Sequence, residues 1–332
     1  MTVFSKLPGS APLIRRSFPA PRPSRTPALA RTVGLALALA LAASLLPGHE
    51  ARSATTSLPL QTDDLGIANV DMPLGGTTER FILDTGSRDA LHLPASLSAT
   101  IPGLRWTGEK ARSLDLTGTV SESDRFVIPR LSLGHLTLRD VQGVALKPWG
   151  LSIGGYSAPE AGVPVVGLEF FKDLWTLIDL PNNRLTLGDR GPLSRDGWTE
   201  LPYRLDEEGL VVMMTDGTRT YPFVLDTAAS ASLVKAEILP EGAPRVPLDA
   251  IRPASPNPGS GGNSGAPQTG ELRFTPLKVA GIDDSPVFYA LVWQGLPEDF
   301  RLDGLLGQDF FERFAVQFNM REKRLLVKPL DQ

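Results

Sequence analysis

The sequence repeats one strand-and-turn motif, and this repeat constrains the fold more than any other feature. Residues 81–87 (FILDTGS) are an apolar run that ends in an acid and a tight turn, and residues 223–230 (FVLDTAAS) repeat it 142 positions later. Each copy has an apolar companion downstream, residues 165–171 (VVGLEFF) and residues 305–311 (LLGQDFF), which lie 140 positions apart. Two motifs repeated in the same order at nearly the same spacing predict one domain-sized unit used twice.

The two copies also share a local plan. In the first copy, residues 65–74 read as a strand, Gly75-Gly76 as a hairpin turn, and residues 80–83 as the strand that returns to Asp84. In the second copy, the strands are residues 210–214 and 221–225, with Asp216-Gly217 as the turn. Short helices are expected at residues 167–174 and 308–314. Each unit therefore delivers one carboxylate at the end of a hairpin strand.

These motifs resemble those of the pepsin-like and retropepsin-like aspartic peptidases. The resemblance rests on the apolar-apolar-Asp-Thr-Gly-Ser turn, on the apolar-apolar-Gly element about eighty residues downstream, and on the doubling of both, and it covers roughly residues 60–330. It implies an all-β, two-lobed acid-protease fold made of two similar β-barrel-like units with short helices.

The predicted domains are a leader at residues 1–54, an N-terminal lobe at 55–195 and a C-terminal lobe at 196–332. The boundary between the lobes falls in a stretch rich in Gly, Pro and charge near residues 189–198. Residues 252–270 are mostly Pro, Gly, Ser and Asn, so we expect a loop there. A surface insertion is the first interpretation of this loop, and gating of a substrate cleft is the second.

The leader has the composition of an export signal. An apolar run at residues 33–46 follows Arg31, and it has the length of a signal-peptide core rather than of a membrane span. We expect export to the periplasm or the medium, with an uncleaved leader that anchors the protein as the alternative. Residues 1–54 carry seven Lys/Arg and one Asp/Glu, so the remaining chain has 26 Lys/Arg and 36 Asp/Glu and is acidic. This charge argues against nucleic acid as a partner.

Two facing carboxylates can hydrolyse a peptide bond without a metal. Like charges held close together resist joint ionisation, so one acid keeps its proton while the other is charged and takes a proton from water. The resemblance implies that Asp84 and Asp226 form this pair in an aspartic endopeptidase that acts on polypeptides. Because one chain supplies both acids, we expect a monomer, and no cofactor is required.

The neighbours of the two acids have supporting roles in this prediction. The resemblance implies that Thr85 and Thr227 each reach the backbone of the opposite unit and lock the turns together. Gly86 allows backbone N–H groups to approach a carboxylate closely, and Ser87 is able to donate a hydrogen bond to Asp84. The counterpart of Ser87 in the second copy is Ala229, which cannot donate.

The chain departs from the family pattern in two places. Ala228 stands where the family has Gly, and a methyl group there would be strained if the backbone φ were positive. Residues 107–125 contain no Tyr, whereas pepsin-like relatives have one in a hairpin over the cleft; Trp106 is the nearest aromatic residue. The alternative function is therefore a peptide-binding or scaffold protein that keeps the fold without catalysis. A carboxylate-pair glycosidase ranks last, since platforms of aromatic residues for sugars are not evident.

Other chemistries receive little support. The chain has no cysteine, which excludes disulfides and thiolate sites. His92 and His135 are lone histidines in strand-like runs, without acids at ligand spacing, so no metal is expected. Residues 232–235 match a Ser-x-x-Lys pattern but lack its companion motifs, and a strand is the interpretation there.

Overall fold

The computed structural model describes residues 53–64, 66–114, 120–147, 162–193, 196–239, 245–247, 271–283, 285–293 and 300–330. These residues belong to one compact unit, Ser53–Gln332. Residues 1–52 of the predicted leader, residues 115–119 and the predicted loop at 252–270 lie outside the described residues. The division into lobes at residues 195 and 196 stays a prediction.

The described elements are almost all strands. The first half of the unit contains β1 (Thr55–Thr62), β2 (Ala68–Leu74), β3 (Thr77–Asp84), β4 (Leu91–Leu93), β5 (Arg105–Leu114), β6 (Val120–Leu133), β7 (Leu136–Ala145), β8 (Val165–Gly167), β9 (Trp175–Asp179) and β10 (Arg184–Gly188). The second half contains β11 (Thr199–Glu200), β12 (Arg204–Leu205), β13 (Leu210–Thr215), β14 (Thr220–Leu225), β15 (Leu233–Lys235), β16 (Arg245–Pro247), β17 (Glu271–Val279), β18 (Phe288–Trp293), β19 (Gly304–Leu306), β20 (Phe314–Asn319) and β21 (Arg324–Pro329). The helices are single turns: α2 (Ala95–Ser98), η1 (Leu168–Phe171), η2 (Ala236–Ile238) and α3 (Gln308–Phe311).

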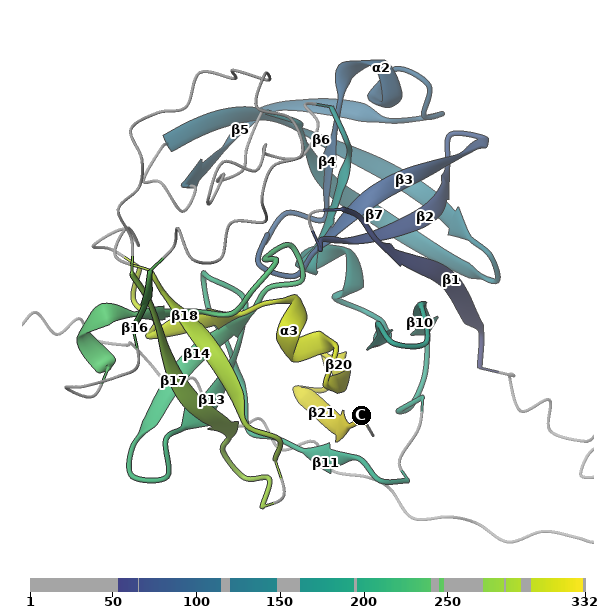
Figure 1. Cartoon of the computed structure of the whole chain (residues 1–332). Helices are drawn as coiled ribbons and strands as arrows, with labels where there is room; N and C mark the ends of the chain where they lie inside the picture. Colours follow the sequence, from purple (N-terminus) through teal and green to yellow (C-terminus); the bar gives the residue numbers. More distant parts are fainter. Residues whose placement is uncertain are drawn as a thin grey trace, which may run out of the picture. The chain divides into compact units, whose positions relative to one another are not determined.

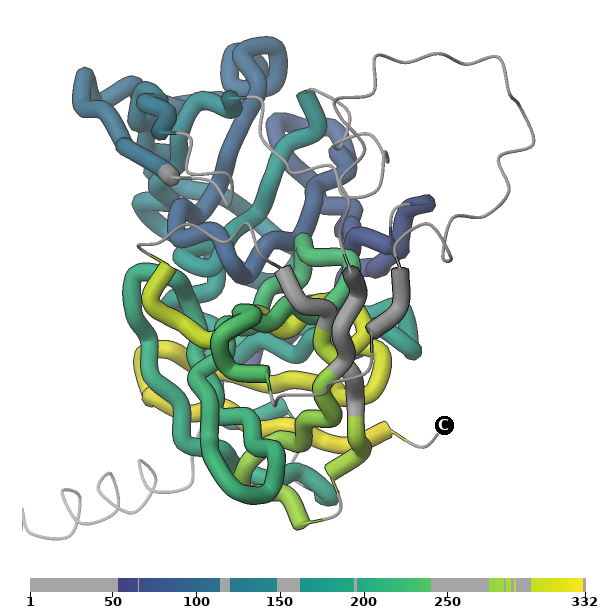
Figure 2. The backbone as a smooth tube through the Cα atoms, turned by 60° about the vertical axis from the view of Figure 1, so that its left-hand side comes forward, coloured from purple at the N-terminus to yellow at the C-terminus, as the bar shows by residue number. Residues whose placement is uncertain are grey.

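The two halves use the same strand order. Neighbouring strands in the first half run β2-β3-β8-β4-β7-β6, and those in the second half run β13-β14-β19-β15-β18-β17. The parallel pairs also match, because β3–β8 and β4–β7 have β14–β19 and β15–β18 as their counterparts. Figure 2 shows most of the purple-to-teal chain gathered in one body and most of the green-to-yellow chain in another. The repeat found in the sequence is therefore a repeat of topology.

A six-stranded stretch of sheet joins the halves, in the order β11-β21-β20-β9-β10-β1. Its central pair is β20 with β9, in which Gln317 lies opposite Leu177. These two residues are 140 positions apart, as the repeated motifs are, so each faces its own counterpart. The next pairs, Val316 with Ile178 and Phe318 with Thr176, are symmetric about that point. A pseudo-twofold axis thus passes between β9 and β20 (Figure 1 labels β20, β21, β10 and β11).

The hairpins that carry the acids form for local reasons. Gly75 and Gly76 have φ values of +64° and +92°, a conformation that favours glycine in a tight turn between β2 and β3. Between β13 and β14, the Asp216 carboxylate accepts the N–H groups of Thr218 and Arg219 at 2.7 and 2.8 Å. In both returning strands, β3 and β14, the last three residues before the acid are apolar and buried in the core. Both returning strands therefore end with an acid next to the core.

Two expectations need correction. The helix expected at residues 167–174 is only one 3₁₀ turn, η1, because the chain turns at residues 172–174 and then enters β9, which pairs with β10 and β20. The helix expected at residues 308–314 is likewise limited to α3, since Phe314 already belongs to β20. The strand prediction for residues 232–235 is confirmed by β15.

Aromatic side chains link the two halves inside the core. Phe171 of η1 and Phe318 of β20 are fully buried, with their ring centroids 6.1 Å apart in an edge-to-face arrangement. Phe310 stacks on Phe314, with centroids 4.7 Å apart. Such aromatic pairs add roughly 0.5–1.5 kcal/mol beyond the area that they bury. One core therefore runs through both repeats.

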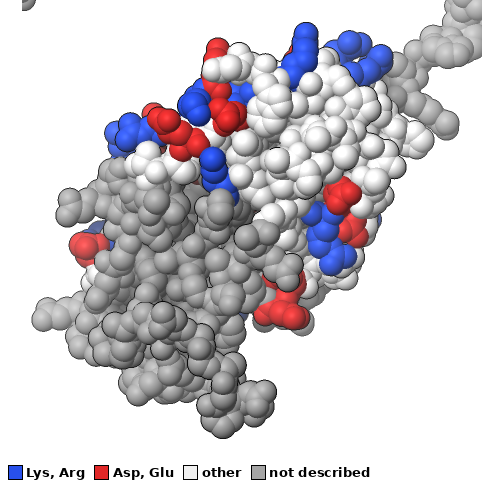
Figure 3. All heavy atoms as spheres, turned by 90° about the horizontal axis from the view of Figure 1, so that it is seen from above, with Lys and Arg blue, Asp and Glu red and all other residues white. Residues whose placement is uncertain are grey.

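Charged side chains of both signs are interspersed on the surface, as the face in Figure 3 shows. Lys110 pairs with Asp124 at 3.1 Å, and both are more than half exposed, so this ion pair contributes little to stability. None of the described helices is long and apolar enough to cross a membrane.

Candidate active site

The two Asp-Thr turns face each other and are locked together by their threonines. Thr85 Oγ1 donates to the Leu225 carbonyl at 2.7 Å and accepts the Thr227 N–H at 3.1 Å. Thr227 Oγ1 donates to the Leu83 carbonyl at 2.6 Å and accepts the Thr85 N–H at 3.0 Å. Both threonines are buried, with exposed fractions of 1% and 0%. Each hydroxyl therefore satisfies two backbone groups of the opposite repeat, as the resemblance implies.

Each acid is held by the backbone of its own turn. Asp84 Oδ1 accepts the N–H groups of Gly86 and Ser87, both at 2.9 Å. Asp226 Oδ1 accepts the N–H of Ala228 at 2.9 Å. These hydrogen bonds favour the charged carboxylate and fix its orientation.

Gly86 brings the two carboxyl groups to the same place. A Cβ atom at Gly86 would lie 2.9 Å from Asp226 Cγ and 3.0 Å from its Oδ2, closer than real contacts allow. The Asp226 carboxyl group therefore packs directly on the residue whose N–H binds Asp84. Glycine is required here because of this close approach.

Ala228 is accommodated without strain. Its φ is not among the positive values found for non-glycine residues, which occur at Asp140, Asn183 and Lys323. Its methyl group packs against an apolar cluster of the first half that contains Ile67, Ile82 and Val165. The residue that departs from the family pattern thus makes an apolar contact between the halves.

The pKa values of both acids are raised. For Asp84, burial is the largest cause, and the nearby charge of Asp226 raises its pKa further, against the lowering effect of its backbone hydrogen bonds. For Asp226, burial likewise raises the pKa, again opposed by backbone hydrogen bonds. Such a pair holds a proton at a pH well above the ordinary carboxyl pKa of 3.8.

The structure differs from the expectation for Ser87. Its backbone N–H binds Asp84, but its hydroxyl pairs with His92 Nε2 at 2.8 Å. The reason is that β4 turns the His92 ring toward the Asp84 turn. Sequence reasoning treated His92 as an isolated histidine, and only the pairing of β4 reveals this contact.

Other supporting residues were also missed. Arg88 follows Ser87, donates to the Asp206 carbonyl at 2.7 Å and pairs with Glu169 at 3.1 Å, so it ties the first turn to the second half. Gln308, which is buried, donates to the Thr227 carbonyl. These residues differ in type between the two repeats, so comparison of the copies gave no signal for them.

The close crossings expected at the downstream motifs are present. A Cβ atom at Gly167 would lie 2.1 Å from the Asp89 carbonyl oxygen, and one at Gly307 would lie 2.5 Å from Ala231 C. Each glycine allows its strand to pass directly behind an Asp turn. The role is structural, as expected.

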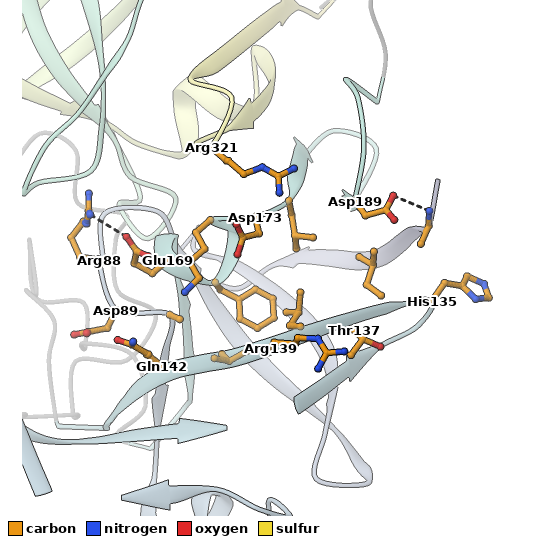
Figure 4. A pocket seen from close by; sticks show the side chains of 18 of the residues that line it. Arg88, Asp89, His135, Thr137, Arg139, Gln142, Glu169, Asp173, Asp189 and Arg321 are labelled. Carbon is orange, nitrogen blue, oxygen red and sulfur yellow. Dashed lines mark hydrogen bonds and ion pairs between the residues drawn. The ribbon is translucent and has the colours of Figure 1, made fainter. Parts of the chain in front are cut away.

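A separate hollow of about 590 Å³ lies beside β7 and η1 (Figure 4). Its lining includes Arg88, Glu169, Asp173, Arg139 and Arg321, but neither member of the acid pair. Arg88 and Glu169 point toward each other at one side of it. Among the described residues, no group of three or more His, Asp or Glu is placed to hold a metal ion.

The threonine lock leads to a stability prediction. Thr85→Val keeps the shape of the side chain but leaves a buried carbonyl and a buried N–H without partners, so we expect a loss of about 2–5 kcal/mol in the free energy of unfolding. Urea denaturation measures this loss. Thr78→Val, at an exposed position on the same strand, is the matched control and should change it by less than about 0.5 kcal/mol. Similar losses of unfolding free energy in both variants would contradict the role assigned to the Thr85 hydroxyl.

The glycine and alanine of the two turns should respond differently to exchange. Gly86→Ala places a methyl group against the Asp226 carboxyl group, so we expect a loss of about 1–3 kcal/mol in unfolding free energy. Ala228→Gly removes one apolar contact and frees the backbone, with a loss of about 1 kcal/mol or less. Parallel urea denaturations compare the two, and equal losses would show that the turns are not asymmetric.

The comparisons agree with this geometry at the level of the fold. No protein-family model matches the sequence, and no curated protein matches it. Among solved structures, basic 7S globulin from soybean matches with a TM-score of 0.51 and 11% identity, over 83% of this chain and 94% of the globulin. Conglutin gamma, a basic 7S globulin from lupine seeds, matches with a TM-score of 0.51 and 10% identity, over 83% and 95% of the two chains. The aspartic proteinase from Irpex lacteus matches with a TM-score of 0.49 and 17% identity, over 84% and 98%.

At these identities the likeness concerns the fold alone. The described chain is mostly β with a few single-turn helices, it repeats one strand order twice, and it places two locked Asp-Thr turns at the pseudo-twofold axis. The predicted acid-protease fold class is confirmed: the chain has a pepsin-like fold over most of its length.

Proposed function

We propose that the protein is an aspartic endopeptidase in which Asp84 and Asp226 activate a water molecule. The observation that carries the proposal is the meeting of both carboxyl groups at Gly86. Asp84 accepts the N–H of Gly86, and the Asp226 carboxyl group fills the space that a side chain at Gly86 would need. Both carboxyl groups thus contact the same residue, and this arrangement supports the sharing of one proton and one water molecule.

The proposed reaction needs one proton on the pair. The charged acid takes a proton from the water molecule as the oxygen attacks the carbonyl carbon of the scissile bond. The protonated acid donates its proton to the carbonyl oxygen, which gives a tetrahedral intermediate. The C–N bond of this intermediate then breaks as the acid that received the water proton passes it to the leaving nitrogen, and one hydroxyl proton of the intermediate returns to the other acid as the carboxyl product forms. The pair titrates as a unit, so the two roles are not assigned to individual residues.

The surroundings of the pair support this chemistry. Burial and mutual repulsion favour the singly protonated state over the doubly charged one. The threonine lock and the backbone hydrogen bonds fix both carboxyl groups before substrate arrives, which reduces reorganisation during the reaction. Since Ala228 is unstrained and still donates its N–H to Asp226, the Gly-to-Ala departure leaves the geometry intact.

We further propose that the substrate is an unstructured polypeptide, that the protein acts as a monomer, and that it is exported. A single chain supplies both acids, so a second copy is not needed for catalysis. Trp106 is half exposed and packs edge-on against Phe126, with the ring centroids 5.6 Å apart, and we propose it as an apolar contact for a substrate side chain. The export proposal rests on the apolar run at residues 33–46.

A peptide-binding protein without catalysis is the alternative. Two of the similar structures are named as globulins, and a fold can be kept while its chemistry differs. The absence of Tyr from residues 107–125 favours this alternative, because pepsin-like relatives have a tyrosine in a hairpin over the cleft. Both functions would use the surface around the two Asp-Thr turns but differ in what the acid pair does.

The enzyme proposal predicts that either acid is essential. Asp84→Asn and Asp226→Asn in the full chain should each lower the cleavage rate of a denatured, unlabelled polypeptide on the order of 10³-fold or more, since one amide cannot exchange the proton. Mass spectrometry of the products over time measures the rate. The effect should be the same for both acids because they act as one unit.

The matched control is Asp124→Asn, which replaces an exposed acid. It should cleave like the parent protein. Full activity of either dyad variant would remove the proposed mechanism. Absence of cleavage by the parent protein, together with saturable peptide binding, would establish the alternative.

The raised pKa values predict how stability depends on pH. An acid whose pKa is raised on folding stabilises the folded state at low pH, and this contribution is lost as the pH rises through the folded-state pKa. Asp226→Asn should therefore raise the melting temperature at pH 7, by ~3 °C or more. At pH 3, Asp226 is protonated in both the folded and the unfolded protein, so the variant and the parent should have the same melting temperature. Calorimetry at the two pH values measures this, and a lower melting temperature for the variant at pH 7 would contradict burial as the cause.

A further inference from the structure

His92 lies one strand away from the strand that carries Asp84. It is the central residue of β4, where it pairs with Val144 of β7 on one side and with Val165 of β8 on the other. Strand β8 in turn runs parallel to β3, with Gly167 opposite Asp84. The sheet therefore places the imidazole and the acid on either side of one short strand.

Ser87 connects the two groups. Its N–H and that of Gly86 both bind Asp84 Oδ1, each at 2.9 Å. Its hydroxyl lies 2.8 Å from His92 Nε2. Asp84 thus receives two backbone hydrogen bonds, while the hydroxyl beside it is engaged by the imidazole.

The second repeat has an apolar pair in the same positions. Ala229 replaces Ser87, and Leu233 pairs with Leu305 of β19 as His92 pairs with Val165 of β8. Ala229 and Leu233 belong to one apolar cluster. The hydroxyl and the imidazole are therefore both present in one repeat and both absent from the other, which indicates that they work together.

Burial leaves the ring of His92 neutral around pH 7. Burial lowers its pKa, and the charge of Asp89 opposes this effect only in part. Asp89 is itself paired with Arg125 at 3.3 Å, and Arg125 lies opposite Val144, the strand partner of His92. On the β8 side, the partner is the apolar Val165. A neutral imidazole has one nitrogen that accepts a hydrogen bond.

We propose that His92 is a positioning residue: its Nε2 accepts the hydrogen bond of the Ser87 hydroxyl and so holds that donor away from Asp84. Without this partner, the hydroxyl would turn to the adjacent carboxylate and favour its charged form. His92 thereby helps the Asp84 carboxyl group to keep its proton. For catalysis this inference rests on the proposed function, but the hydrogen-bond arrangement stands without it.

The test replaces His92 in two ways in the full chain. His92→Leu removes the acceptor and matches its neighbours Leu91 and Leu93, whereas His92→Gln keeps an acceptor oxygen within reach of Ser87. The probe is the ¹³C-carboxyl titration of Asp84, followed by NMR with labelled aspartate. We expect His92→Leu to lower the titration midpoint by about one pH unit, and His92→Gln to leave it at the parent value.

The Ser87→Ala background separates the hydroxyl from a direct effect of the ring. In that background, His92→Leu should leave the midpoint of Asp84 unchanged. A shift of equal size would overturn the proposal, because the imidazole would then act on Asp84 without the serine. An unchanged midpoint for His92→Leu in the parent background would overturn it as well.

Two further readouts complete the test. In the parent protein, the ¹⁵N shift of His92 Nε2 near pH 7 should be that of an unprotonated acceptor nitrogen; a protonated Nε2 would overturn the proposal even if His92→Leu failed to fold. If the protein cleaves polypeptides, the basic limb of its pH–rate profile should move to lower pH in His92→Leu and return in His92→Gln. A titration shift without any cleavage would support the positioning role while rejecting the endopeptidase function.

Discussion

The reciprocal contact of Thr85 and Thr227 is the interaction on which the site depends. Each hydroxyl donates to a carbonyl and accepts from an N–H of the opposite repeat, so four buried backbone groups are satisfied by two side chains. Buried polar groups without partners are costly, and the turns therefore remain stable only when they are together. The approach of the two acids is a consequence of this lock, since Asp84 and Asp226 each precede one of the threonines.

Symmetry positions the acids, and departures from symmetry distinguish them. The pseudo-twofold axis passes between Leu177 and Gln317 in the sheet and between the two threonines in the turns. Around it, Gly86 receives a carboxyl group against its Cα, whereas Ala228 packs its methyl group on the core of the first half. Two acids in equivalent backbone settings thus experience different surroundings, which is a general way to separate the proton affinities of a pair.

The repeat made much of the fold predictable from the sequence. Motif spacing located both acid-bearing hairpins, and glycine in the downstream motifs indicated the close crossings of Gly167 and Gly307. The helix at residues 167–174 was predicted too long because an apolar segment between two turns fits a short helix or a strand equally well. The partner of Ser87 could not be predicted, since His92 reaches it only through the pairing of β4 with β7 and β8. The bonds of Arg88 to Asp206 and Glu169 likewise depend on long-range packing.

The shared stretch β11-β21-β20-β9-β10-β1 has a consequence for how the protein comes apart. Each repeat supplies three of the six strands of this layer, and β9 and β20 pair with each other at its centre. If one repeat lost its order, the central strand of the other repeat would have an unpaired edge. Open flanks of buried strands expose unpaired amides and invite association with other chains. Loss of order in one half would therefore be transmitted to the other through the backbone ladder itself, and the molecule should melt as a single cooperative body rather than in two stages.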